Sequence, residues 1–235
     1  MKPIYILLFI SFFFSTELFS QQGLGVMVDR AQQALTELGN RSSRKPKPRD
    51  IQGTHYFNEN FEVATLDYFG KELNDKGFMR YNAFRDEIEM ASTATQNESD
   101  LILMQSKDIV PVISGEKYLY LPHRLEDGRA YIGYLILLYE GKKNTVYIKR
   151  HKVFMDEVIA RTGLENPFPP RFVDDVKIYV SQNGDTPTPL KQSKKAVSSF
   201  FKENSDRIRK FIKANKLKVS QPKAIIKIFE FADNL

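Results

Sequence analysis

The stretch AYIGYLILLYEGKKNTVYIK, residues 130–149, decides the fold class of this chain of 235 residues. Its first half, residues 130–139, is a continuous apolar run, Gly141 marks a turn, and residues 145–149 return with polar and apolar side chains in alternation. An apolar run, a turn and an alternating run in this order predict a β-hairpin. Because residues 130–139 are apolar at both odd and even positions, we expect this strand to be central and covered on both faces.

Short runs with a two-residue period lie on both sides of this hairpin. They predict an antiparallel β body over residues 53–190, either a sandwich or a curled sheet. Residues 176–180 are expected to form a further strand that ends at the turn Asn183-Gly184. Residues 154–161 are expected to form a brief helix, and Thr186-Pro-Thr-Pro189 is expected to interrupt regular structure.

The period of the apolar residues becomes helical from Ser193 onward. Residues 191–235 therefore predict a group of short basic amphipathic helices, packed on or beside the β body. Ser193, Ser205 and Ser220 lie where helix N-caps belong, and Pro222 falls in the first turn of the last helix. The fold class is accordingly mainly β, with a helical tail.

The first fifty residues predict an exported chain. Residues 1–20 have the positive start, apolar run and small final residue of a secretory signal peptide, and the run is too short to span a membrane as a helix. Residues 21–40 predict a short amphipathic helix, and residues 41–52 a basic, proline-containing linker. We therefore expect the protein in the periplasm or at the periphery of the outer membrane.

The charge is distributed unevenly along the chain. The whole chain carries +6, but residues 50–190 hold sixteen basic against twenty-two acidic side chains, and residues 191–235 hold twelve against four. An acidic body between basic flanks predicts a protein partner in the envelope, and contact of the basic tail with an anionic membrane surface. Nucleic acid is not an expected partner, because an exported protein seldom meets it.

Several kinds of chemistry lack their usual residues in this sequence. The chain has no cysteine, which excludes disulfides, thiolate metal sites and a cysteine nucleophile. Its three histidines, His55, His123 and His151, are far apart in sequence, and neither a phosphate-binding glycine loop nor a nucleophile elbow is present. The sequence therefore predicts no metal, no cofactor, no catalytic residues and a protein that is not an enzyme.

The densest polar segment, residues 80–89, supplies most of the candidate binding residues. On a strand, Glu87 and Glu89 would share one face and Asp86 would point to the other, with Arg80 and Arg85 near enough to neutralise them. We expect a cluster of cross-strand ion pairs and turn contacts rather than a functional site. The full set of candidate binding residues is Arg80, Tyr81, Asn82, Asp86, Glu87, Glu89, Tyr118 and Tyr120.

Several short motifs occur together between residue 53 and the end of the chain. They are Gly53-Thr-x-Tyr56-x-Asn58, Met79-Arg-Tyr-Asn82 leading into Asp86-Glu-Ile-Glu89, Pro170-Arg-Phe-Val-Asp174, the Asn183-Gly184 turn and the lysine-rich tail. With these motifs the chain resembles exported proteins of unknown function that are abundant in Bacteroidota. The resemblance covers most of the chain after the signal and implies an envelope or surface location. It implies no catalytic residues.

These features favour a non-enzymatic envelope protein that binds another protein, for example as an accessory or plug subunit of an outer-membrane complex. This last role is an analogy with other small envelope proteins. Two alternatives remain open. Tyr118 and Tyr120 would project from one sheet face, where an aromatic platform could bind a glycan or a peptide. An envelope hydrolase would use Asp86, Glu87 and Glu89, provided that they converge in a cleft.

Overall fold

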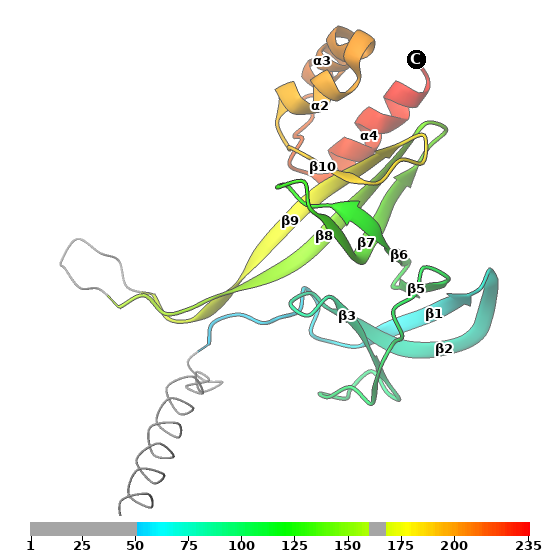
Figure 1. Cartoon of the computed structure of the whole chain (residues 1–235), viewed down its shortest axis with the longest axis vertical. Helices are drawn as coiled ribbons and strands as arrows, with labels where there is room; N and C mark the ends of the chain where they lie inside the picture. The colour runs from blue at the N-terminus through cyan, green and yellow to red at the C-terminus, as the bar shows by residue number, and fades with distance from the viewer. Residues whose placement is uncertain (1–50, 160–167) are drawn as a thin grey trace, which may run out of the picture. The chain divides into compact units, whose positions relative to one another are not determined.

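The computed structural model describes residues 51–159 and 168–235 (Figure 1). The chain divides into two units, Met1–Lys47 and Pro48–Leu235, and all described residues belong to the second. The predicted signal peptide, the predicted helix over residues 21–40 and most of the predicted linker lie outside the described residues. None of the described helices has the length and apolar character needed to cross a membrane.

The described strands form one ten-stranded sheet in the order β10-β9-β8-β7-β6-β5-β1-β2-β3-β4, with antiparallel pairing between neighbours. The mainly β class is therefore confirmed, in a single sheet and not in two. The strand bounds are β1 (Glu62–Tyr68), β2 (Lys71–Asn82), β3 (Glu87–Ala91), β4 (Leu101–Ile102), β5 (Ile109–Ile113), β6 (Glu116–Arg124), β7 (Ala130–Glu140), β8 (Asn144–Met155), β9 (Arg171–Gln182) and β10 (Thr188–Leu190).

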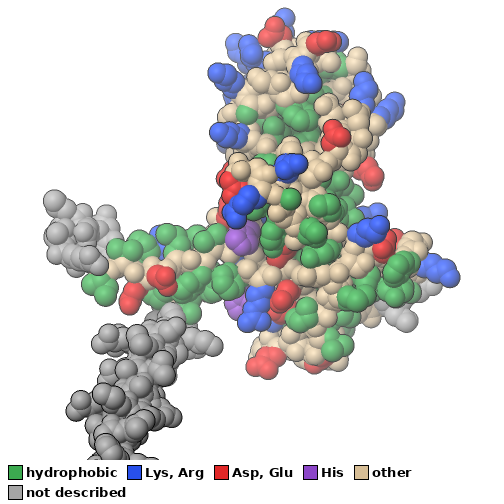
Figure 2. All heavy atoms as spheres, in the orientation of Figure 1, with side chains coloured by type: hydrophobic (Ala, Val, Ile, Leu, Met, Phe, Trp, Pro, Cys, Tyr) green, Lys and Arg blue, Asp and Glu red, His purple; other side chains and the backbone are tan. Residues whose placement is uncertain are grey.

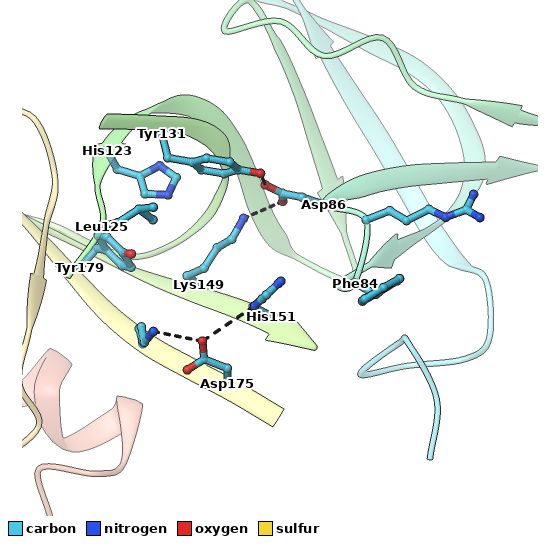
Figure 3. A pocket seen from close by; sticks show the side chains of 11 residues that line it. Phe84, Asp86, His123, Leu125, Tyr131, Lys149, His151, Asp175 and Tyr179 are labelled. Atoms are coloured by element: carbon cyan, nitrogen blue, oxygen red, sulfur yellow. Dashed lines mark hydrogen bonds and ion pairs between the residues drawn. The ribbon is translucent and has the colours of Figure 1, made fainter. Parts of the chain in front are cut away.

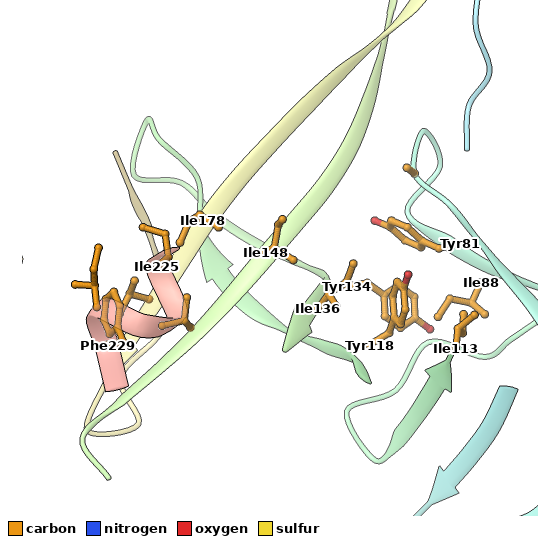
Figure 4. Packing of buried hydrophobic residues seen from close by; sticks show 14 of the residues in the cluster. Tyr81, Ile88, Ile113, Tyr118, Tyr134, Ile136, Ile148, Ile178, Ile225 and Phe229 are labelled. Atoms are coloured by element: carbon orange, nitrogen blue, oxygen red, sulfur yellow. The ribbon is translucent and has the colours of Figure 1, made fainter. Parts of the chain in front are cut away.

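A short junction between β5 and β6 connects the two halves of the sheet. Only Val112↔Lys117 and Ile113↔Glu116 pair there, around a tight turn in which Ser114 and Gly115 have φ of 48° and 83°. Buried side chains of both halves meet beside this junction (Figure 4). The rings of Tyr81 and Tyr118, one from each half, have their centroids 5.3 Å apart. The core is therefore continuous across the junction.

The predicted hairpin is present as β7 and β8, but its surroundings differ from the expectation. In β7 only residues 133–136 are buried and residues 130–132 are exposed, so the strand is covered over its centre alone.

The helix expected over residues 154–161 is wrong for the described positions, because Phe154 pairs with Phe172 and Met155 with Arg171 on β9. The proline segment is regular in its second half only: Thr186 and Pro187 lie outside the strands as expected, but Pro189 lies in β10, at the edge of the sheet, where its missing N–H is tolerated.

The C-terminal helices are α2 (Lys194–Phe200), α3 (Ser205–Ala214) and α4 (Pro222–Asp233), with a 3₁₀ turn, η2 (Lys202–Asn204), between the first two. Ser193 caps α2 as predicted, since its Oγ accepts a hydrogen bond from the Ala196 N–H. The other two predicted caps are wrong by one position, because the N-cap residues of α3 and α4 are Asn204 and Gln221.

Helix α4 packs against the β7–β8 end of the sheet. Its buried residues Ile225 and Phe229 lie in one cluster with Ile178 of β9 (Figure 4). At its C-terminal end, the Asp233 carboxylate accepts hydrogen bonds from Tyr139 Oη at 2.8 Å and from Asn144 Nδ2 at 2.9 Å. Apolar burial and this polar contact together hold the tail on the sheet.

Substitution of Gly141 should detach this end of α4. A Cβ atom at Gly141 would overlap the Asp233 carboxylate and the Tyr139 ring, so Gly141→Ala is expected to lower the free energy of unfolding by about 1–3 kcal/mol. Urea unfolding measures the loss, and hydrogen exchange should show early exchange at the end of α4. Gly77→Ala is the control, since its Cβ would have no neighbour closer than 4.0 Å. Equal stability of the two variants would contradict the prediction.

Candidate functional site

Arg80 and Glu89 form a buried ion pair across β2 and β3. The two residues are direct partners in the strand register, and Arg80 Nε lies 2.8 Å from Glu89 Oε2. The same carboxylate accepts hydrogen bonds from Asn82 Nδ2 at 2.8 Å and from Tyr56 Oη at 2.9 Å. The predicted cross-strand ion pair is therefore present, but it is buried and does not lie on an open sheet face.

The Arg80 guanidinium is fully engaged within the protein. It donates to the backbone carbonyls of Glu59 and Asn97 at 2.8 Å and 3.0 Å. It also lies between the rings of Tyr56 and Phe61, 4.0 Å and 4.2 Å from their centroids. Planar stacking and a fork of donors are the contacts that arginine makes better than lysine. This part of the candidate set therefore fixes the fold of the β2–β3 hairpin.

The protonation of this network follows from its burial and hydrogen bonds. Burial and the adjacent Glu89 carboxylate raise the pKa of Tyr56 to about 12. Burial also acts to raise the pKa of Glu89, but hydrogen bonds from Asn82, Arg80 and Tyr56 hold that pKa below its usual range. Glu89 is therefore an anion at neutral pH, and Tyr56 a hydrogen-bond donor.

Asp86 belongs to a second network, separate from that of Glu89. It lies in the β2–β3 turn with φ of 59°, a conformation that Asp adopts more readily than most residues. Its carboxylate lies 2.6 Å from Lys149 Nζ and accepts hydrogen bonds from Tyr81 Oη at 2.6 Å and from the Tyr134 N–H at 3.3 Å. Glu87 is half-buried and belongs to neither network. The three carboxylates therefore do not converge, contrary to the arrangement expected for an envelope hydrolase built on Asp86, Glu87 and Glu89.

A cavity of about 250 Å³ adjoins Asp86 and Lys149, and we name it the Asp86 cleft (Figure 3). Side chains from the β2–β3 turn and from β6, β7, β8 and β9 line it. The lining residues are Phe84, Arg85, Asp86, His123, Leu125, Tyr131, Lys149, His151, Asp175, Lys177 and Tyr179. Of the candidate residues from the sequence, only Asp86 lines the cleft. Tyr81 does not line it but donates a hydrogen bond to the Asp86 carboxylate.

The charges of the Asp86 cleft are paired with one another. Burial lowers the pKa of Lys149, although its partner Asp86 acts to raise it, and its ammonium also donates to the Tyr134 carbonyl at 2.9 Å. On the other wall, Lys177 Nζ lies 3.0 Å from Asp175 Oδ2, and His151 Nδ1 lies 3.8 Å from the same oxygen. The cleft therefore contains two ion pairs, Asp86 with Lys149 and Asp175 with Lys177, in each of which the opposite charges offset one another.

His123 is the buried polar group of the cleft that lacks a partner. The side chain is 1% exposed, and its Nδ1 lies 3.1 Å from the Leu121 carbonyl oxygen. A carbonyl oxygen only accepts, so Nδ1 carries the proton and Nε2 is left as an acceptor. Nε2 has no hydrogen-bond partner among the described residues. The rings of Tyr131 and Tyr179 hold the imidazole from two sides, at centroid distances of 5.4 Å and 5.1 Å.

The histidines should make stability depend on pH. Burial lowers the pKa of His123, His151 and His55 below the ordinary value of 6.5. The unfolded chain therefore takes up these protons at a higher pH than the folded chain does. The free energy of unfolding is expected to fall as the pH drops below about 6.5, and to keep falling down to the lowered pKa values.

Urea unfolding between about pH 8 and about pH 5 measures this dependence. Replacement of His123 by Phe is expected to flatten the curve more than replacement of His151, whose side chain is 39% exposed. A free energy of unfolding that stays constant over this interval would contradict the assignment of neutral buried histidines.

The tyrosine platform expected on β6 does not form an exposed surface. Tyr118 is buried, and Tyr120 is half-buried with its ring 5.1 Å from that of the buried Tyr134. These rings pack between the two halves of the sheet and are not available for stacking on a glycan or a peptide. Core packing, the more ordinary use of aromatic residues on strands, explains them.

Beyond the β7–β8 pairing, β8 and β9 continue as a two-stranded ribbon (Figure 1). The pairing of β7 with β8 stops at Ile136↔Ile148, whereas β8 and β9 stay paired to Met155↔Arg171. We name residues 149–159 and 168–177 the β8–β9 arm. Figure 2 shows apolar side chains along it. Those of Val153, Met155, Val158 and Ile159 are 36–69% exposed.

The two faces of the arm differ. Phe154 and Phe172 pair across one face, and the Phe172 ring lies 5.2 Å from that of Phe84 in the β2–β3 turn. Val153 and Met155 project to the other face, because side chains alternate along a strand. The second face, which carries Val153 and Met155, is named the Val153 face.

A comparison of the chain with family models, with curated proteins and with solved structures found no match. The functional proposals below therefore rest on the structure, chiefly on the Asp86 cleft and the Val153 face. No cluster of three or more metal-binding side chains is found among the described residues.

Proposed function

We propose that the chain is an exported, non-enzymatic protein that binds another protein of the cell envelope. An accessory or plug subunit of an outer-membrane complex is the role that we favour. The observation that carries the proposal is the Val153 face of the β8–β9 arm. A two-stranded ribbon with exposed apolar side chains is a feature that a partner can cover.

The energetics of the arm support a partner. An isolated two-stranded ribbon is marginally stable in water, so further contacts are expected to hold such an extension. Burial of the exposed parts of Val153, Met155 and Val158 would contribute on the order of 1 kcal/mol each. Ala83 bonds the β8 edge at Lys152 and Gln52 bonds the β9 edge at Pro170 and Phe172, so a partner strand would use the edges outside these contacts.

The state of the charged groups supports a binding role over catalysis. Arg80 and Glu89 neutralise each other in the core, and Lys149 does the same for Asp86. A catalytic base or nucleophile must reach its substrate in a reactive protonation state. Here the buried carboxylates are occupied by intramolecular partners.

The test places a charge on either face of the arm. The double variant Val153→Asp/Met155→Asp is expected to lose its partner, measured as a photo-crosslink from residue 158 in intact envelopes and as co-purification after mild detergent extraction. Val176→Asp is the matched control, because Val176 has a similar exposure, 38%, and lies on the opposite face. Loss of the crosslink in both variants, or in neither, would overturn the assignment of the Val153 face.

The basic tail supports a second contact of the same protein, with anionic headgroups. A hollow beside α2 and α3 is lined by Lys194, Lys195, Arg209 and Lys213 together with Ile212. Each such cation near an anionic surface contributes about 1 kcal/mol. Co-sedimentation with phosphatidylglycerol vesicles, absent with phosphatidylcholine vesicles and weakened by salt, is the expected result. Equal binding to both kinds of vesicle would remove this contact.

A further inference from the structure

We propose that the Asp86 cleft binds one neutral ring that carries several hydroxyl groups, as a single uncharged sugar residue does. The cleft shares Lys149, His151, Asp175 and Lys177 with the base of the β8–β9 arm, but the inference uses neither Val153 and Met155 nor a protein partner. It also differs from the tyrosine platform expected on β6, since Tyr118 and Tyr120 do not line the cleft.

The volume of the cleft sets the size of the ligand. A cavity of about 250 Å³ has room for about eight water molecules, at about 30 Å³ each. Pockets for drug-sized molecules begin at about 300 Å³. A single ring with its substituents therefore fits, and a longer ligand would have to extend out of the cleft past the exposed Phe84 and Arg85.

The charges of the cleft favour a neutral ligand. Asp86 is paired with Lys149, and Asp175 is paired with Lys177 and faces His151. A charged ligand would have to break one of these pairs and leave its partner buried or half-buried without compensation, which is costly. A neutral ligand can use the remaining lone pairs and N–H groups with both pairs intact. Arg85, the further charged residue of the lining, is exposed and keeps its hydration.

The hydrogen-bonding groups of the cleft specify hydroxyls. His123 Nε2 is a buried acceptor without a partner among the described residues, and a donor that reached it from the cleft would satisfy it. The Lys149 ammonium has three N–H groups, of which the described contacts to Asp86 and Tyr134 use two. A hydroxyl both donates and accepts, so a ring with several of them can satisfy both groups at once.

The remaining walls supply apolar surface for the face of such a ring. Tyr131 and Phe84 line the cleft and are 42% and 45% exposed. Leu125 adds an apolar side chain beside His123 and Tyr179 (Figure 3). The faces of aromatic rings carry partial negative charge, which attracts the C–H groups of a sugar. The cleft thus offers an apolar wall beside donors and acceptors, the usual composition of a small-molecule site.

The experiment titrates the full chain with methyl glycosides of glucose, galactose, mannose and N-acetylglucosamine, and observes the side-chain resonances of His123 and Lys149 by NMR. At least one neutral glycoside is expected to shift the His123 Nε2 resonance with millimolar affinity. Glucuronate and glucosamine, which carry a charge, are expected to bind at least tenfold more weakly. Absence of any shift, or tighter binding of a charged sugar, would overturn the proposal.

Two variants test whether the ligand binds in the cleft, and two others serve as controls that leave the cleft intact. His123→Phe keeps a ring of similar shape, removes the acceptor and is expected to weaken binding at least tenfold. Leu125→Trp fills the cleft and should abolish binding, while Leu101→Trp on the exposed strand β4 should leave it unchanged. Val153→Asp/Met155→Asp is expected to bind the glycoside normally, so failure of the partner proposal leaves this one standing. Unchanged binding in Leu125→Trp would place the ligand elsewhere and refute the site.

Discussion

Replacement of Arg80 by Met is expected to lower the free energy of unfolding by about 3–5 kcal/mol, the usual cost of removing one partner of a buried ion pair. The variant would leave the Glu89 carboxylate, 6% exposed, with its charge uncompensated. It would also remove the hydrogen bonds to the carbonyls of Glu59 and Asn97, and the stacking on Tyr56. Chemical denaturation monitored by tyrosine fluorescence measures the change.

The double variant Arg80→Met/Glu89→Leu is the control for this result. It removes both charges, and it is expected to recover a large part of the loss, because two apolar side chains of similar volume need no compensation. If the double variant were no more stable than Arg80→Met, the loss would come from stacking and carbonyl contacts and not from the unpaired carboxylate.

Replacement of Asp86 by Asn is expected to cost a similar amount, about 3–5 kcal/mol. Asn has the same shape and tolerates the positive φ of this turn, so the variant removes the charge and keeps the backbone. Lys149, at 8% exposure, would then be buried beside neutral groups only. The loss of stability measures how strongly Asp86 holds that ammonium in the cleft.

The pH dependence of this variant gives an independent check. Without Asp86, the effect of burial on Lys149 is no longer opposed, and its pKa is expected to fall further below the ordinary 10.5. A base whose pKa is lowered in the folded state destabilises the protein at every pH at which the unfolded chain carries that proton. The variant should therefore regain stability as the pH rises and Lys149 becomes neutral.

Asp127→Asn serves as the matched control for the Asp86 variant. Asp127 also lies in a turn and is paired with a base, Arg129 at 2.7 Å, but both side chains are at least half-exposed. Its loss is expected to cost less than about 1 kcal/mol. Equal effects of Asp86→Asn and Asp127→Asn would show that burial of the Lys149 pair contributes nothing.

The sequence predicted those parts of the fold that depend on neighbouring residues. The β7–β8 hairpin follows from an apolar run and a turn, and the cap at Ser193 from one side chain before a helical period. A cluster of cross-strand ion pairs over residues 80–89 was also predicted, and the structure shows which residues pair in it, Arg80 with Glu89. In each case the decisive contacts span few residues.

The Asp86 cleft could not be predicted in this way. Its residues come from five segments, and they meet only because β6, β7, β8 and β9 pair in a particular register. His123 and Lys149 stand beside other basic residues, Arg124 and Arg150, so nothing in their own segments marked them for burial. The arm was not predicted, because the apolar residues among 153–159 fit a helical period as well as a strand period. Pairing of β8 with β9 decides for the strand.

The order of the strands has a consequence for how the chain folds. Among the described strands, each neighbour pair except β1 with β5 joins strands that follow each other directly along the chain. Hairpins close short loops and form early, whereas a pairing that skips three strands must wait until those strands have been synthesised. We therefore expect β5 to be the last strand to join the half formed by β1 to β4. During that interval the outer edge of β1 stays open, so the chain is most prone to mispair there before Ile109–Ile113 arrives.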